Sequence, residues 1–191
     1  MLIIFEGMDR CGKDTQIKNT FNYLINHLND IRPIHVIHYS AVPIKNKNQV
    51  IEYSKKTYNA MFNIAENYMN HYNIILNRAH LGECVYGYIY RNYQADWIFD
   101  VELEYHDLVK SKDTVLITLV DSSWNCLTRE DGNSLSNCDI QKANLEYDRF
   151  FIATNKSNIR NKYFLDIANK TIEEVKNDIY SYLDVIYLEK K

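Results

Sequence analysis

The sequence predicts an α/β fold, in which a five-stranded parallel sheet is covered by helices on both faces. Short apolar runs typical of buried strands alternate along the chain with longer segments whose apolar residues recur at helical spacing. Strands that alternate with helices form parallel sheets, and such sheets bind ligands at the carboxyl ends of their strands. The 191 residues contain no internal repeat and no low-complexity linker, so we expect one domain over residues 1–191.

The first part of the chain predicts two strands and two helices. Residues 2–5 form an apolar run that is closed by a glycine, and residues 17–28 carry apolar side chains at helical spacing, which predicts strand, loop and helix. Residues 32–38 are predicted as a second strand because the turn-prone segment 39–43 follows them. Residues 49–72 predict a long polar helix with one apolar stripe.

The middle of the chain predicts two further strands. Residues 73–76 form a third buried strand that leads into Arg78, and residues 81–91 and 97–109 have helical spacing. Residues 115–120 are rich in β-branched side chains and leucine, which makes them the clearest strand of the sequence. Arg78 and the glycine loop after the first strand should therefore meet at one edge of the sheet.

The last part of the chain predicts a long loop, a fifth strand and two helices. The polar residues 129–139 have the composition of a loop. Residues 141–155 resume helical spacing, and residues 163–167 form the last strand. Thr171 and Glu174 match a capping box, which predicts a final helix that begins there and ends near residue 187.

Composition and charge exclude several classes of protein. The chain has 22 Lys and Arg against 25 Asp and Glu, a net charge of −3, so it lacks the basic excess usual in proteins that bind duplex nucleic acid. No apolar run reaches the ~18 residues of a membrane span, and the first residues lack the basic start of a signal peptide. The four cysteines form no CxxC pair, which argues against a zinc site and a disulfide framework. We expect a cytoplasmic protein without a membrane role, for which nucleic acid is a disfavoured partner.

A phosphate-binding loop follows the first predicted strand. Residues 7–14, with the sequence GMDRCGKD, match the pattern GxxxxGK[ST] at every position but the last, and they lie between a predicted strand and a predicted helix, as the motif requires. The glycines let backbone N–H groups turn toward an anion, the helix N-terminus adds partial positive charge, and Lys13 reaches the β and γ phosphates. The sequence therefore predicts binding of ATP and Mg²⁺. The nucleotide-binding residues that it predicts are Gly7, Arg10, Cys11, Gly12, Lys13, Asp14 and Thr15.

Asp14 is the departure from this motif. The Ser or Thr that usually stands there ligates Mg²⁺ through its hydroxyl. A carboxylate about 4 Å from a phosphate charge is repelled by roughly 4 kcal/mol at an effective dielectric of 20, and a Mg²⁺ ion between them reverses the sign. We expect Asp14 to take part in holding the metal, while the Thr15 hydroxyl bonds to a phosphate. The alternatives are that Asp14 turns to solvent or that the loop binds nucleotide poorly.

The loop and the segments after it resemble the thymidylate kinase family. Residues 5–16, FEGMDRCGKDTQ, resemble the FEGxDxxGK(S/T)TQ opening of that family, which is more specific than a phosphate loop alone. The likeness continues in order along nearly the whole chain. Asn77-Arg78 stands where the family has Asp-Arg, and Arg129 stands at the arginine that opens its lid. The resemblance implies the three-layer α/β sandwich of P-loop kinases, a short lid near residues 129–139 and a possible homodimer.

The resemblance also implies roles for individual residues. Asp9 would contact the sugar 3'-hydroxyl of the acceptor, and Arg78 would hold the acceptor phosphate. Arg10 would neutralise charge on the migrating phosphoryl group, and Arg129 would close over the donor. Phosphoryl transfer depends mainly on positioning and on charge neutralisation by Mg²⁺, Lys and Arg, which agrees with these roles. The predicted catalytic residues are Lys13, Arg10, Arg78 and Arg129.

The acceptor side departs from the family pattern. Family members have an arginine after the substrate-stacking aromatic of the long helix, whereas residues 63–67 contain none, and the side chains that read thymine are not evident in residues 80–87. We expect Phe62 to stack on the acceptor base and Tyr86 or Arg91 to line its pocket. Glu83 either orients a hydroxyl, serves as a base or is merely exposed. The predicted substrate-binding residues are Asp9, Phe62, Arg78, Glu83, Tyr86 and Arg91.

Four functions are consistent with these residues. The leading one is transfer of the γ-phosphate of ATP to a (deoxy)nucleoside monophosphate, which gives the diphosphate. A nucleoside kinase would instead need a carboxylate base for the 5'-hydroxyl, which Glu6 or Glu83 would supply. A kinase that acts on DNA or on a modified base is disfavoured by the absence of a basic stripe. A nucleotide-binding module without catalysis would account for Asp14.

Overall fold

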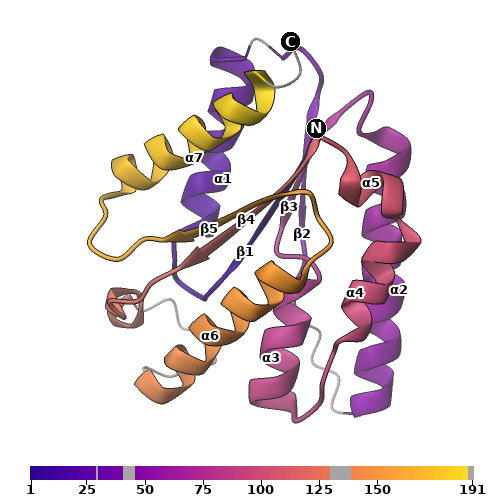
Figure 1. Cartoon of the computed structure of the whole chain (residues 1–191), viewed down its shortest axis with the longest axis vertical. Coiled ribbons are helices and arrows are strands. Elements are labelled where there is room, and N and C mark those ends of the chain that lie inside the picture. The colour runs from indigo at the N-terminus through magenta and orange to yellow at the C-terminus, as the bar shows by residue number, and fades with distance from the viewer. Residues whose placement is uncertain (29, 41–45, 130–138, 189–191) are drawn as a thin grey trace.

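The computed structural model describes residues 1–28, 30–40, 46–129 and 139–188, and its strands form one parallel sheet in the order β2-β3-β1-β4-β5 (Figure 1). The strands are β1 (Leu2–Gly7), β2 (Ile34–His38), β3 (Asn73–Asn77), β4 (Thr114–Val120) and β5 (Asn161–Asp166). The helices are α1 (Lys13–Asn26), α2 (Lys47–Tyr68), α3 (Leu81–Arg91), α4 (Trp97–Glu104), α5 (His106–Lys110), α6 (Ile140–Lys156) and α7 (Ile172–Leu188), with a 3-10 turn η1 at Asn125–Thr128. The predicted α/β class and the five-stranded parallel sheet are confirmed.

Most of the predicted elements are present, with differences at their ends. The predicted helix 97–109 is two helices, because the chain leaves the helical region at Tyr105. The long helix begins earlier than predicted, at a side-chain cap from Asn46, and it ends at Tyr68. The capping box at Thr171 and Glu174 is confirmed, since each side chain accepts a hydrogen bond from the backbone N–H of the other. Apart from its two end residues, the predicted lid 129–139 lies outside the described residues.

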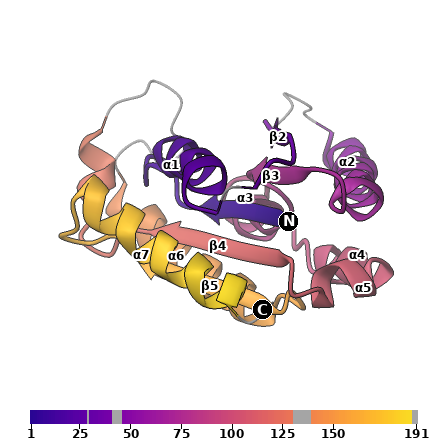
Figure 2. The same ribbon diagram turned by 90° about the horizontal axis from the view of Figure 1, so that it is seen from above.

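Alternate side chains of the strands face two different helical layers. On one face Ile3 and Phe5 of β1 belong to a core cluster that α1 and α7 complete, and these two helices contact each other. On the other face Leu2 and Ile4 pack with α2, α4 and α5. These three helices gather on one side of the molecule in both ribbon views (Figures 1 and 2). Both faces of the sheet are thus buried, which is typical of parallel sheets.

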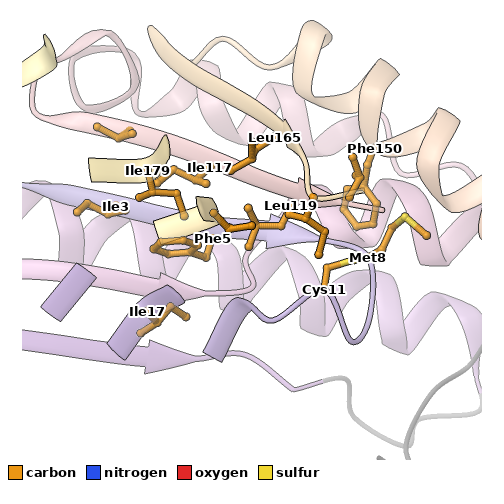
Figure 3. Packing of buried hydrophobic residues seen from close by; sticks show 14 of the residues in the cluster. Ile3, Phe5, Met8, Cys11, Ile17, Ile117, Leu119, Phe150, Leu165 and Ile179 are labelled. Carbon is orange, nitrogen blue, oxygen red and sulfur yellow. The ribbon is translucent and has the colours of Figure 1, made fainter. Parts of the chain in front are cut away.

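The core extends from the sheet into the loop after β1. Met8 and Cys11 of that loop are buried in the same cluster as Leu119 and Phe150 (Figure 3). Close packing of this kind limits movement of the loop backbone. None of the described helices is long and apolar enough to cross a membrane.

Candidate nucleotide-binding site

The loop between β1 and α1 begins with a backbone conformation and a close contact that require glycine. Gly7 has a φ of 126°, and a Cβ atom placed on it would lie 1.9 Å from the carbonyl oxygen of Leu119 in the neighbouring strand. Gly12, with a φ of 77°, lies in the left-handed region directly before α1. Arg10 also has a positive φ of 64°, although it is not a glycine. Such backbone conformations cost about 1–3 kcal/mol for a side chain and cluster at ligand sites.

Lys13 places its ammonium group inside this loop. The side chain is buried, and Nζ donates hydrogen bonds to the carbonyl oxygens of Gly7 at 2.8 Å and Met8 at 2.6 Å. Burial lowers the pKa of Lys13, and the nearby charge of Arg78 lowers it further. A cation held in a partly desolvated loop interacts strongly with an anion that replaces water there. The structure therefore places the Lys13 ammonium inside the loop between β1 and α1.

Arg10 and Arg129 lie together at the mouth of the loop. Arg10 Nη1 donates to the carbonyl oxygens of Leu127 at 3.1 Å and Arg129 at 2.9 Å, and Arg129 Nη1 donates to the carbonyl oxygen of Arg10 at 3.1 Å. Asp121, which follows β4, fixes the same segment because its carboxylate accepts the N–H of Cys126 at 2.7 Å. The start of the predicted lid is thus tied to the phosphate loop.

A small pocket opens on the α1 side of the loop. It has a volume of about 60 Å³ and lies between the N-terminus of α1, Arg129 and the start of α7. Gly12 and Thr15 line it from the loop, and Ile167 and Ile172 line it from the β5–α7 connection. This pocket combines an apolar wall with the phosphate loop, as a site for the base and phosphates of a nucleotide requires.

Arg78 lies at the opposite side of the loop, directly after β3. Its backbone N–H donates to the carbonyl oxygen of Phe5 at 2.8 Å, and its φ is 65°, again in the left-handed region. Its guanidinium is partly exposed and forms an ion pair with Asp9, with Nη2 and Oδ1 3.0 Å apart. The parallel register of β1 and β3 therefore brings Arg78 beside the loop, as the sequence predicted.

A second pocket, of about 40 Å³, opens on this Arg78 side. Its walls include Arg78, Tyr86 and Arg91, and also Tyr39 and Tyr58, which the sequence analysis did not single out. Phe62 does not line it: that ring is 1% exposed and packs on His80 and Tyr105 with centroids 5.0 and 5.6 Å away. Tyr58, one turn earlier on α2, occupies the pocket wall instead.

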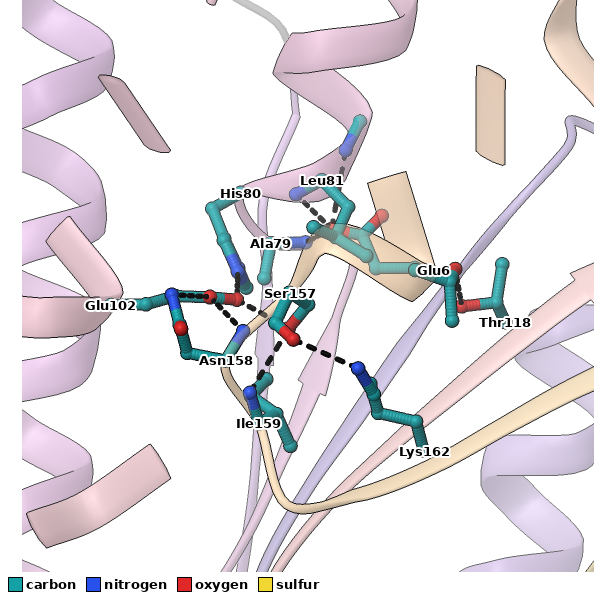
Figure 4. A network of polar contacts seen from close by, with 12 residues as sticks. Glu6, Ala79, His80, Leu81, Glu102, Thr118, Ser157, Asn158, Ile159 and Lys162 are labelled. Carbon is teal, nitrogen blue, oxygen red and sulfur yellow. Dashed lines mark hydrogen bonds and ion pairs between the residues drawn. The ribbon is translucent and has the colours of Figure 1, made fainter. Parts of the chain in front are cut away.

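The buried carboxylate Glu6 holds α3 against the loop. It accepts the backbone N–H groups of Ala79 at 3.0 Å, Leu81 at 2.8 Å and Gly82 at 3.3 Å (Figure 4). Burial raises the pKa of Glu6. Because the first N–H groups of a helix have no partners within the helix, this carboxylate acts as a cap at the beginning of α3.

A second buried network lies behind the same helix end. Glu102 on α4 contacts His80 Nε2 at 2.7 Å and accepts hydrogen bonds from the Ser157 hydroxyl at 2.6 Å and the backbone N–H of Asn158 at 2.5 Å (Figure 4). Burial raises the pKa of Glu102, but the hydrogen bond and charge of His80 together with the bonds from Ser157 and Asn158 outweigh it, and the pKa is lowered. The network joins α4 and the α6–β5 connection to the residues that precede α3.

Asp14 and Asn77 contact each other at the carboxyl edge of β3. Asn77 Nδ2 donates to Asp14 Oδ1 at 2.5 Å, although the two residues are 63 positions apart. Asp14 is exposed, whereas Asn77 Oδ1 is buried and has no hydrogen-bond partner among the described residues. A carboxylate and an amide oxygen are ligands that Mg²⁺ accepts alongside phosphate oxygens. The Asp14 carboxylate therefore fits a Mg²⁺ ion, and Asn77 would join it with its amide turned so that Oδ1 takes the place of Nδ2.

Glu146 is a candidate site residue that sequence reasoning did not single out. It lies on α6, is buried, and accepts a hydrogen bond from the Tyr90 hydroxyl at 2.5 Å. Burial raises its pKa to about 7, and the nearby charge of Asp9 also raises it, while Lys13 and other cations oppose the shift. In the sequence, Glu146 stands among other polar residues of a predicted helix, so nothing there indicates that it is buried beside the phosphate loop.

Comparison with known proteins supports the fold. No family model and no curated protein sequence matches this chain. It is similar to the structure of thymidylate kinase from Candida albicans, with 15% identity, a TM-score of 0.59, and coverage of 96% of this chain and 91% of that one. The chain has a thymidylate-kinase-like P-loop kinase fold. It is also similar to the YorR protein from Bacillus subtilis in complex with phosphorylated GDP, with 17% identity, a TM-score of 0.63, and coverage of 98% of each chain. Identities this low establish the P-loop kinase fold alone.

Proposed function

We propose that this chain transfers the γ-phosphoryl group of ATP to a (deoxy)nucleoside monophosphate and forms the diphosphate. One observation carries the proposal: the phosphate loop lies between two pockets, with Gly12 in the wall of one and Gly7 in the wall of the other. A donor on the α1 side and an acceptor on the Arg78 side would meet at the loop. The names of the two similar structures, a thymidylate kinase and a protein solved with phosphorylated GDP, support a nucleotide as the substrate.

The donor side supplies charge neutralisation. The loop N–H groups and the N-terminus of α1 would bind the ATP phosphates, with Lys13 on the β and γ phosphates and the Thr15 hydroxyl on a phosphate oxygen. Asp14 and Asn77 would hold the Mg²⁺ ion, which neutralises phosphate charge when bound. Arg10 and Arg129 already lie together at the loop mouth, where they would contact the migrating group and the donor.

The acceptor side supplies positioning. The guanidinium of Arg78 would donate two parallel hydrogen bonds to the acceptor phosphate, a geometry that suits Arg better than Lys. Asp9 holds that guanidinium at 3.0 Å and would accept a hydrogen bond from the sugar 3'-hydroxyl. Holding the two phosphates in line provides most of the catalysis that phosphoryl transfer requires.

The carboxylates near the acceptor favour a monophosphate over a nucleoside. A nucleoside hydroxyl needs a base, but Glu6 is occupied by three backbone N–H groups, and Glu83 accepts bonds from Tyr58 and Arg91. An acceptor phosphate is already anionic and needs no such base. The remaining alternatives are a kinase that acts on DNA and a nucleotide-binding module without catalysis. The homodimer and the cytoplasmic location stay predictions.

A coupled assay of ADP release tests the proposal. Purified protein is given ATP and Mg²⁺ with each common nucleoside monophosphate, with nucleosides and with oligonucleotides, and we expect turnover with monophosphates only. Lys13→Met and Arg78→Met should each lower kcat/KM at least 100-fold, roughly the loss of one charged contact to the transferring groups. Arg160→Met removes an exposed arginine directly before β5, and it serves as the control.

The lid arginine gives a separate test of the donor side. If Arg129 contacts the donor mainly in a closed state, Arg129→Ala should lower kcat about tenfold or more with little effect on the Kd for ATP. Equal losses in both quantities would mean a ground-state contact. Binding of ATP without turnover of any acceptor would contradict a kinase and favour the binding module.

A further inference from the structure

Arg91 is held in a fixed position at the wall of the acceptor pocket. It is the last residue of α3, and its Nη1 reaches back along the helix to Glu83 Oε1 at 2.6 Å, eight residues earlier. Side chains on a helix point toward its N-terminus, and Gly87 lies between the two residues on the same face.

The turn after α3 closes over Arg91 from the other side. Asn92 adopts the left-handed conformation with a φ of 52°, which ends the helix and turns Tyr93 back toward it. The Tyr93 ring then packs on Gly87, where an added Cβ would lie 3.0 Å from the ring carbons. Its hydroxyl lies 3.3 Å from Arg91 Nη1. A guanidinium held in this way loses little conformational entropy when it binds a ligand.

The part of this ion pair that a ligand can reach consists of hydrogen-bond donors. Glu83 is only 2% exposed, and its two oxygens accept bonds from Arg91 and from the Tyr58 hydroxyl, the latter at 3.1 Å. The Arg91 side chain is 27% exposed. Its contacts with described residues use Nη1, which leaves Nε and Nη2 for a ligand. Arg91 thus lines the pocket together with Arg78 and carries two adjacent N–H donors that no described residue uses.

We propose that Arg91 reads the base of the acceptor nucleotide and selects guanine. This inference rests on the proposed function, in which Arg78 holds the acceptor phosphate. Guanine presents two neighbouring acceptors, O6 and N7, and a bidentate contact from arginine to them is the commonest specific contact between a protein and a base. On the corresponding edge, adenine replaces O6 by an amino donor, cytosine carries an amino donor, and thymine offers a single oxygen beside a methyl group. Cytosine has two neighbouring acceptors, O2 and N3, on its opposite edge, so dCMP is the most demanding competitor of dGMP. Glu83, Tyr58 and Tyr93 act as positioning residues for Arg91.

Tyr39 lies in the wall of the acceptor pocket and is held there by few contacts. The pocket is small, with a volume of about 40 Å³, so we expect this side chain to shift when a base enters. Tyr39 is half-buried, and its hydroxyl makes a long contact of 3.4 Å with Ser54. Its ring lies 5.1 Å from that of Tyr58, too close to admit a base between the two, so a shift of Tyr39 would open one face of the Tyr58 ring to the base.

Nucleotide analogues test the proposal at the level of single atoms. We expect wild-type kcat/KM for dGMP to exceed the values for dAMP, dCMP and dTMP about tenfold or more, the discrimination that one bidentate arginine supplies. The analogue 7-deaza-dGMP lacks the N7 acceptor and should lose most of this advantage. Arg91→Met keeps the stem without the donors, and Arg91→Lys keeps the charge without the fork. Both should remove the difference between dGMP and its 7-deaza analogue, whereas the control Arg160→Met should keep it.

The outcomes separate this inference from the proposed function. Turnover with equal kcat/KM for the four monophosphates, or a preference for dGMP that survives Arg91→Met, overturns the role of Arg91 and leaves the kinase standing. If no monophosphate is turned over, the proposed function fails, and calorimetric titration with the same monophosphates decides about Arg91. Selective binding of dGMP by the wild type but not by Arg91→Met supports the inference, and unselective or absent binding overturns it.

Discussion

Moving the carboxylate from position 14 to position 77 by substitution is the sharpest test of the metal site. Both residues depart from the thymidylate kinase pattern, which has Ser or Thr in the loop and Asp after the third strand, and the structure brings the two departures within 2.5 Å of each other. A carboxylate therefore stands on the loop where the family has it on the strand. If the carboxylate holds Mg²⁺, its location within the pair matters less than its presence.

The expected magnitude follows from the charges. A unit charge about 4 Å away contributes roughly 4 kcal/mol at an effective dielectric of 20, and the exposure of Asp14 to solvent reduces this. We expect Asp14→Thr to weaken Mg²⁺ binding by about 2 kcal/mol, which raises the half-saturating Mg²⁺ concentration about 30-fold. Asn77→Asp would place two carboxylates side by side, so it should destabilise the metal-free protein and be rescued by Mg²⁺.

The double variant Asp14→Thr/Asn77→Asp restores the family pattern and should recover Mg²⁺ dependence to within a few-fold of the wild type. The assay is ADP release, or nucleotide binding followed by calorimetry, titrated with Mg²⁺ at fixed ATP. Asp100→Thr, an exposed carboxylate on α4, is the matched control. An unchanged Mg²⁺ requirement in Asp14→Thr, or a double variant no better than Asp14→Thr, would refute the reasoning.

Three further predictions concern stability, each measured as the free energy of unfolding in urea. Gly7→Ala should unfold the protein or cost more than about 3 kcal/mol because its Cβ meets the Leu119 carbonyl, whereas Gly12→Ala, with no atom within 4 Å of its Cβ, should cost about 1 kcal/mol; similar losses would contradict the clash. Glu102→Gln should cost about 2–4 kcal/mol because an amide N–H₂ then faces buried donors, and a neutral effect would mean that the network relaxes. The pKa of Glu146 is raised to about 7 from an ordinary 4.5, so the folded state keeps a proton that the unfolded state releases, and the stability of the wild type should fall as the pH rises from 4.5 to 7. Glu146→Gln should gain up to roughly 3 kcal/mol of stability relative to the wild type over that range. Parallel pH profiles of the two proteins would count against this prediction.

Local sequence signals predicted the phosphate loop because its causes are local. Gly7, Gly12 and Lys13 lie within one loop, and the strand before it and the helix after it have clear periodicity. The break at Tyr105 had no such signal, since helical spacing continues through it. The break accompanies a tertiary contact, in which the Tyr105 hydroxyl donates to the carbonyl oxygen of Asn59 on α2 at 2.9 Å.

The acceptor pocket could be predicted only in part, because it depends on how far each helix is shifted lengthwise against its neighbour. Tyr58 and Phe62 lie one turn apart on the same stripe of α2, so the sequence alone does not distinguish which ring reaches the pocket. Glu83 was assigned three alternative roles, and its bonds to Tyr58 and Arg91 depend on the packing of α2 against α3. Periodicity gives the face of a helix but not its longitudinal position.

The site also shows how a chain of net negative charge can bind anions. Its cations are held individually before any ligand arrives: Arg78 by Asp9, Arg91 by Glu83, and Lys13 by carbonyl oxygens of the loop. Each partner orients its cation and also offsets part of the positive charge of that cation. Phosphate binding then depends on short-range, preorganised donors rather than on a long-range positive field, which the overall balance of 22 basic and 25 acidic residues does not provide. Removing a partner such as Asp9 would therefore leave Arg78 with its full positive charge. The arginine would also lose the fixed position on which its contact with a phosphate depends.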